Sequence, residues 1–224
     1  MSTLPVRTGA DAHLASSFDL PGCPLCRERS RTEAAYLESI LAESVLDVGF
    51  RRLLDEARGF CGAHSRSILG SDRRATGSLG ASILLRASLV ARLRDLEAVH
   101  GSGGRTRGRR VSEAARPPAC PACARVASAD AILAAGLVAM TEDARWAEAS
   151  AAAPFCLDHL VLLVGVRPAP AWWLPVEARQ LDRLRRLRDR LDAFAHASAH
   201  DRSHLQTDDA RASVQEASDV LGGG

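Results

Sequence analysis

The feature that most constrains this chain is a set of two cysteine motifs that occurs twice. In the first copy, Cys-Pro-x-Cys is followed by Cys-x-x-His, and the second copy repeats both motifs in the same order. All six cysteines of the 224-residue chain belong to these motifs. The eight motif residues are Cys23, Cys26, Cys61, His64, Cys120, Cys123, Cys156 and His159.

The spacing of the motifs indicates a duplication. Within a copy, 34 residues separate Cys26 from Cys61, and 32 separate Cys123 from Cys156. The copies are offset by 97 residues at Cys-Pro-x-Cys and by 95 at Cys-x-x-His, a period too long for a short solenoid repeat. We therefore expect two tandem homologous units, each with a Cys3His site built from its own copy.

This donor set points to structural zinc. Zinc takes four thiolate or imidazole ligands tetrahedrally, and four protein ligands leave no open position for a substrate. Proline stiffens the Cys-Pro-x-Cys turn, and Cys-x-x-His at a helix start places both donors on one face. We predict two zinc ions. Two alternatives are an iron–sulfur cluster, which the same residue types can hold, and thioredoxin-like disulfide chemistry, which needs a βαβ context that this sequence lacks.

Composition and periodicity predict an all-α fold. The chain is 46% hydrophobic but only 4% aromatic, and its apolar residues are mostly Ala and Leu, which favour helices over strands. Apolar residues recur at steps of three and four along several segments, as on one face of a helix. We expect a flexible lead-in, a first unit, a Gly/Arg-rich linker, a second unit and a disordered tail. Their predicted bounds are 1–20, 21–100, 101–119, 120–200 and 201–224.

Charge and termini limit the classes of function. Basic and acidic residues nearly balance, 29 against 27, so no global field favours nucleic acid or an anionic membrane. The start of the chain lacks a signal-peptide pattern, and we find no apolar run of membrane-spanning length. We expect a cytoplasmic protein without a membrane partner. No common catalytic motif is present, which leans against an enzyme without excluding one.

Three smaller features allow two interpretations each. His196, His200 and His204 could align as a third metal site, or they could be chance histidines at a helix end. Either Trp172 or Trp173 could contact a protein partner, or one could be buried and the other half-covered. Arginines in 101–119 could contact phosphates, although a solvated linker is favoured.

The doubled arrangement resembles a family of uncharacterised bacterial proteins with duplicated CPxC…GFCxxH motifs in a helical scaffold. The resemblance covers about residues 20–200 and rests on the eight motif residues; Pro154 replaces the glycine before the aromatic residue in the second copy. It implies metal binding and a bacterial origin, and no established reaction.

The leading functional hypothesis is a non-catalytic, zinc-containing interaction or regulatory module with an unidentified protein partner. The second is an iron–sulfur protein for electron transfer or for redox or gas sensing. The third is a nucleic-acid-binding protein that uses its Arg-rich segment.

Overall fold

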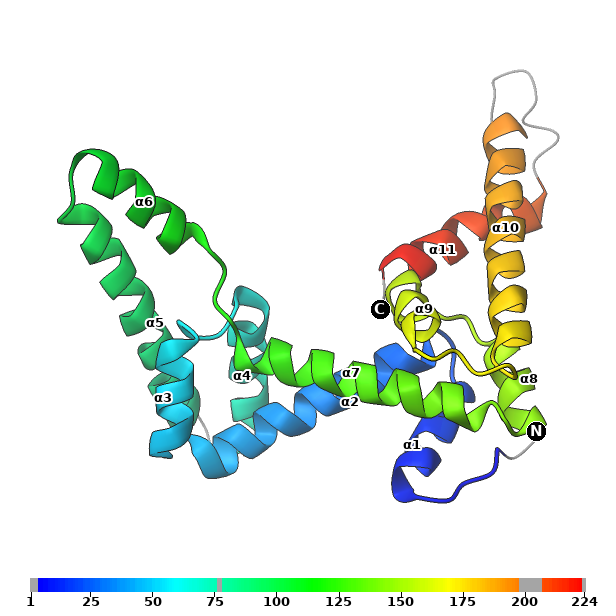
Figure 1. The fold of residues 1–224 in the computed structure, drawn as a ribbon, viewed down its shortest axis with the longest axis horizontal. Helices are drawn as coiled ribbons and strands as arrows, with labels where there is room; N and C mark the ends of the chain where they lie inside the picture. Colours follow the sequence, from blue (N-terminus) through cyan, green and yellow to red (C-terminus); the bar gives the residue numbers. More distant parts are fainter. Residues whose placement is uncertain (1–3, 76–77, 198–206, 223–224) are drawn as a thin grey trace. The chain divides into compact units, whose positions relative to one another are not determined.

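The computed structural model describes residues 4–75, 78–197 and 207–222, and this part of the chain contains helices and no β-strand (Figure 1). The predicted all-α fold is confirmed. The elements are α1 (Gly9–Phe18), α2 (Pro24–Ser39), the π-helix η1 (Ile40–Ser44), α3 (Val48–Glu56), α4 (Gly62–Ala75), α5 (Ser78–His100), α6 (Gly104–Ala115), α7 (Pro121–Met140), α8 (Ala144–Ala152), α9 (Leu157–Gly165), α10 (Leu174–Ala197) and α11 (Asp208–Gly222).

The chain forms two compact units that are not consecutive in sequence. Unit 1 comprises Met1–Arg29 and Asp130–Gly224, and unit 2 comprises Ser30–Ala129. This division differs from the predicted units 21–100 and 120–200. Helices α2 and α7 each cross the boundary between the units, so the chain enters unit 2 within α2 and leaves it within α7.

Unit 1 has an apolar core to which both parts of its sequence contribute. Phe18 from α1 lies edge-on to Trp146 and to Phe155, with ring centroids 5.5 and 6.2 Å apart. Trp173 is fully buried, whereas Trp172 is 43% exposed and donates to the carbonyl of Val138, which agrees with the interpretation of one buried and one half-covered tryptophan. Other large core residues of unit 1 are Leu14, Leu25, Leu137, Leu160 and Leu163.

The predicted lead-in contains a capped helix. The Thr8 side chain accepts from the backbone of Asp11, and the Asp11 carboxylate accepts from the backbone of Thr8, which forms a capping box for α1. Trp146 also donates to the carbonyl of Pro5 at 3.1 Å. Both a local cap and a partner that is far away in sequence therefore contact this segment.

Unit 2 is built around α2 to α5. Its buried apolar residues come from these helices, from η1, from the start of α7 and from the loop before α4, where Phe60 precedes the Cys-x-x-His motif. Phe60 is in tilted contact with Phe50 at 6.4 Å between centroids. The other large core residues of unit 2 are Leu37, Ile40, Leu41, Leu54, Ile68 and Leu84.

The predicted linker contains helix α6, which lies beside α5 (Figure 1). Arg107 and Arg110 of α6 donate to the carbonyls of Val99 and Ala98, at 3.3 and 2.7 Å. These carbonyls belong to the last turn of α5, where they have no partner within their own helix. Two arginines of the predicted linker therefore cap a neighbouring helix, and Arg107 does so while it is exposed to solvent.

The predicted tail contains helix α11, which packs on α10 (Figure 1). Glu216 on α11 accepts from Arg183 at 3.2 Å and also pairs with Arg190, and Arg190 reaches Asp209 at 3.1 Å. Ion pairs therefore connect α11, the helix within the predicted tail, to α10.

One helix, α7, is long and apolar enough to cross a membrane by length and composition alone. Core helices pass the same test, and α7 contributes Leu137 and Val138 to the core of unit 1. Eight of its 20 residues are alanine.

Replacing Gly59 by alanine should destabilise unit 2. Gly59 has a φ of +90°, and an added Cβ would lie 2.6 Å from Cβ and 2.8 Å from Cα of Ser88. We expect Gly59→Ala to lower the free energy of unfolding by about 2–4 kcal/mol, from the left-handed backbone and the overpacked contact. Gly70→Ala on α4, where a Cβ would meet nothing within 4 Å, is the control and should change stability by at most about 1 kcal/mol. Chemical denaturation measures both, and equal stabilities of the two variants would contradict this account.

Candidate metal centres

The structure gathers all eight motif residues into two clusters. In each cluster, one Cys-Pro-x-Cys motif meets one Cys-x-x-His motif, and the four potential donor atoms lie within 4.8 Å of one another. Cluster 1 consists of Cys23, Cys26, Cys156 and His159, and cluster 2 consists of Cys61, His64, Cys120 and Cys123.

The pairing of the motifs is crossed, and the prediction that each site uses a single copy is wrong. Cluster 1 combines Cys-Pro-x-Cys of the first copy with Cys-x-x-His of the second, and cluster 2 combines the other two motifs. The lengths of the helices give the reason. Helix α7 has 20 residues and is about 30 Å long, whereas the following α8 has only nine and spans about half that length. The chain therefore reaches Cys156 without returning to Cys123.

Every motif places its donors at the start of a helix. Helices α2, α4, α7 and α9 each begin directly after the first cysteine of a motif, and the second ligand lies in the first turn. Proline is favoured at the first helical position, where Pro24 and Pro121 stand, because its missing N–H would have no partner there. The N-termini of two helices therefore meet at each cluster, and their dipoles favour negatively charged thiolates.

In cluster 1, the imidazole of His159 faces three sulfur atoms. Its Nδ1 lies 3.6, 3.3 and 3.1 Å from the Sγ atoms of Cys23, Cys26 and Cys156, and the Sγ atoms of Cys26 and Cys156 are 3.5 Å apart. Around a tetrahedral zinc ion, bond lengths of about 2.3 Å to sulfur and 2.0 Å to nitrogen place neighbouring donors about 3.5–3.8 Å apart. The observed spacing is close to that of four ligands on a single ion.

Cluster 2 repeats this geometry. The Nδ1 of His64 lies 3.1, 3.5 and 3.3 Å from the Sγ atoms of Cys61, Cys120 and Cys123. The Sγ atoms of Cys61 and Cys123 are 3.7 Å apart. Both clusters therefore present the same ring nitrogen, Nδ1, to the thiols.

The thiols perturb one another's ionisation. In cluster 1, hydrogen bonds from Cys156 and Cys26 lower the pKa of Cys23, while hydrogen bonding to Cys156 and Cys23 raises the pKa of Cys26. Three closely spaced thiols thus favour a single thiolate with protonated neighbours, because like charges repel. All three can ionise together once a cation neutralises them, and a divalent metal supplies that charge and displaces the protons.

The same effect operates in cluster 2. Burial raises the pKa of Cys61, but hydrogen bonds from the backbone and side chain of His64 and from Cys123 outweigh it and bring the value down to about 7. Burial and the neighbouring sulfur of Cys61 raise the pKa of Cys123 to about 12.

The two clusters differ in their access to solvent. All four residues of cluster 1 are buried, and Cys156 and His159 are each 1% exposed. In cluster 2, Cys123 is exposed and Cys61 is partly exposed. Reagents in solution can therefore reach cluster 2 more readily than cluster 1.

Two carboxylates next to the clusters were missed from the sequence. Asp130 lies beside His159 and is only 3% exposed, and Glu33 lies beside His64. Burial raises the pKa of Asp130, and the nearby charges of Arg29 and His159 oppose this. A signal was available, because each carboxylate stands seven residues after the second cysteine of a Cys-Pro-x-Cys motif.

Comparison with known proteins places these motifs in a family. The model of a family of unknown function, DUF6062, matches residues 18–169, which is more than half of the chain. The chain belongs to DUF6062. No curated protein matches it. No solved structure matches it either. The matched region holds both clusters of this DUF6062 member and ends before α10.

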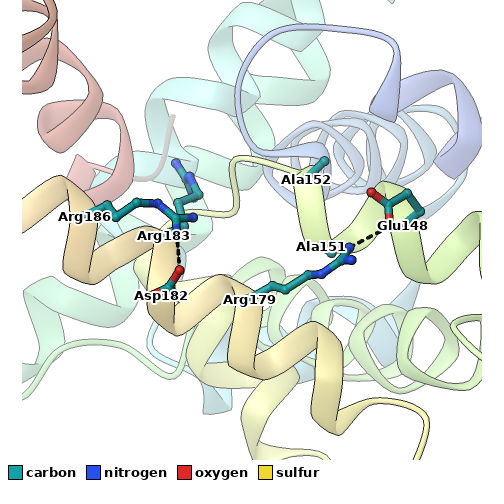
Figure 2. Close-up of a pocket in the computed structure, with 7 residues that line it drawn as sticks. All are labelled: Glu148, Ala151, Ala152, Arg179, Asp182, Arg183 and Arg186. Atoms are coloured by element: carbon teal, nitrogen blue, oxygen red, sulfur yellow. Dashed lines mark hydrogen bonds and ion pairs between the residues drawn. The ribbon is translucent and has the colours of Figure 1, made fainter.

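A pocket lined by charged side chains of this DUF6062 member lies on α10 and α8 (Figure 2). It has a volume of about 460 Å³, and its arginines face carboxylates. Arg179 pairs with Glu148 at 2.6 Å, and Arg186 pairs with Asp182, as the dashed lines in Figure 2 show. Ion-paired side chains of α8 and α10 therefore line this pocket.

Among the described residues, the groups of side chains that could hold a metal ion are clusters 1 and 2. The third metal site suggested by the sequence has no counterpart there. Two of its histidines, His200 and His204, lie outside those residues. The possible site therefore stays a prediction.

The crossed pairing can be tested by counting metal ions in double variants. Cys23→Ser with Cys156→Ser should remove one ion per chain, because both residues belong to cluster 1. Cys23→Ser with Cys61→Ser should remove both ions, because it damages both clusters. Native mass spectrometry after metal reconstitution gives the count. The opposite pattern, two ions lost in the first pair and one in the second, would restore pairing within each copy.

Thiol labelling should reveal the difference in exposure. In the reduced, metal-loaded protein, we expect N-ethylmaleimide to modify Cys123 first and Cys156 last, because solvent reaches only the former. Peptide mass spectrometry over a time course identifies the order. Labelling of cluster 1 before cluster 2 would contradict the burial described above.

Proposed function

We propose that this DUF6062 protein binds one zinc ion in each cluster, and that the two ions stabilise a non-catalytic helical module for interaction or regulation in the cytoplasm. The observation that carries the proposal is the convergence of three sulfurs and one imidazole nitrogen, twice, at spacings suited to one tetrahedral ion. Four protein donors occupy every position of such an ion, so the sites are structural.

The sequence separations explain why such ions would matter for folding. The Sγ atoms of Cys26 and Cys156 are 3.5 Å apart although 130 positions separate these residues in the chain. An ion at cluster 1 would hold the two distant parts of unit 1 together. Structural zinc contributes about 10–16 kcal/mol of apparent binding free energy in zinc-finger peptides at neutral pH, and this becomes folding free energy.

The donor spacing also bears on the iron–sulfur alternative. An iron–sulfur cluster distributes its protein ligands over several iron atoms, whereas all donors here lie within 4.8 Å of one another. This supports a single ion in each site. The nucleic-acid alternative is weakened because Arg107 and Arg110 are engaged with backbone carbonyls of α5.

An exposed apolar stripe on α5 supports the interaction role. Leu89, Leu93 and Leu96 are 67%, 47% and 61% exposed, and their spacing of four and three residues places them on one helix face. Helices bind partner proteins through apolar anchors at intervals of three and four residues.

Elemental analysis with a visible spectrum, on protein purified without oxygen, tests the proposal. We expect two zinc ions per chain and no colour. Removing the ions with a chelator should lower the melting temperature, because the ligands of each cluster come from separate segments. Iron with broad absorption near about 400 nm would instead make this a redox protein. Full stability after complete metal removal would contradict a structural role.

A further inference from the structure

A carboxylate lies behind each histidine of the two clusters. While Nδ1 of the ring faces the thiols, the Nε2 atom of His159 lies 3.9 Å from Oδ1 of Asp130. The Nε2 atom of His64 lies 3.5 Å from Oε1 of Glu33. In cluster 1, both facing atoms are buried, and neither has a hydrogen-bond partner among the described residues.

The two carboxylates occupy equivalent positions. Asp130 follows Cys123 by seven residues on α7, and Glu33 follows Cys26 by seven residues on α2. They are 97 residues apart, which is also the offset between the two Cys-Pro-x-Cys motifs. Each Cys-Pro-x-Cys motif thus supplies two cysteines to one cluster, and the helix that it opens carries a carboxylate beside the histidine of the other cluster.

We propose that Asp130 and Glu33 are outer-shell positioning residues that accept a hydrogen bond from the Nε2–H of His159 and His64. This inference rests on the proposed metal binding. A neutral imidazole carries its proton on one nitrogen and a lone pair on the other. A carboxylate at Nε2 keeps the proton there, which leaves the Nδ1 lone pair directed at the metal and makes it a stronger donor.

Arg29 extends this arrangement in cluster 1. Its Nε lies 3.3 Å from Oδ2 of Asp130, the oxygen that does not face His159. Arg29 stands three residues after Cys26 on α2, so one helix supplies two ligands and also orients the group behind a third ligand.

The pair of Glu33 and His64 is the better one to test by mutation. The Glu33 side chain is 30% exposed, so its replacement need not disturb the core. Outer-shell variants typically weaken metal binding about 10- to 100-fold, and we expect this loss for Glu33→Gln at one of the two zinc ions. Chelator competition measures each affinity, and the ring ¹⁵N signals of the histidines identify His64 as the one affected. Glu38→Gln, an exposed change of the same charge on α2, is the control and should leave both affinities unchanged.

Repeating the Glu33 substitution in a second variant protein shows whether Glu33 acts by positioning His64 or only by stabilising the fold. His64→Cys creates a four-cysteine site that can still bind zinc but lacks the ring through which Glu33 would act. We expect Glu33→Gln to weaken zinc binding in the parent protein and to have no weakening effect in the His64→Cys protein. Equal losses in both backgrounds would overturn the proposal.

Asp130→Asn should give the same result at the other ion, with His159→Cys as its background. Loss of affinity at the His64 site on Asp130→Asn, with the His159 site unchanged, would overturn the assignment of the carboxylates. A failure of the proposed function would be distinguishable from this result, because the unmutated protein would then bind no zinc.

Discussion

The structure depends on bringing three sulfur atoms and an imidazole together twice, from segments that are distant in the chain. Thiolates this close repel one another, and within each cluster the pKa of one thiol is lowered while that of a neighbour is raised. A bound divalent cation would convert this repulsion into attraction. The close spacing that is unfavourable for free thiolates would then allow all of them to bind one ion, which would hold the segments of each unit together.

Helix ends reinforce this requirement. Each cluster lies where two helix N-termini meet, so the backbone contributes positive potential at the site where the thiolates are concentrated. The same preference for satisfied helix ends explains the positions of two arginines in segment 101–119. Arg107 and Arg110 bind the terminal carbonyls of α5, and their positive charge suits that end of a helix.

Much of the candidate site was predictable, because metal ligands are few in type and fixed in local spacing. Cysteine and histidine three residues apart at a helix start share a face regardless of the rest of the fold. The alanine- and leucine-rich composition likewise favours helices locally. By contrast, α1, α6 and α11 were not expected. The capping box of Thr8 and Asp11 was a local signal for α1, whereas contacts with other segments accompany α6 and α11, such as Arg110 with Ala98 and Arg183 with Glu216.

The sequence by itself determined the helical class, the eight potential ligands and their grouping into pairs, since these follow from composition and local spacing. Only the tertiary structure decided which pair meets which. With two copies of identical motifs, pairing within a copy and pairing across copies satisfy the same local rules. The lengths of α2 and α7 and the long-range packing around Trp146 and Phe155 select the crossed arrangement, and no local pattern encodes that choice.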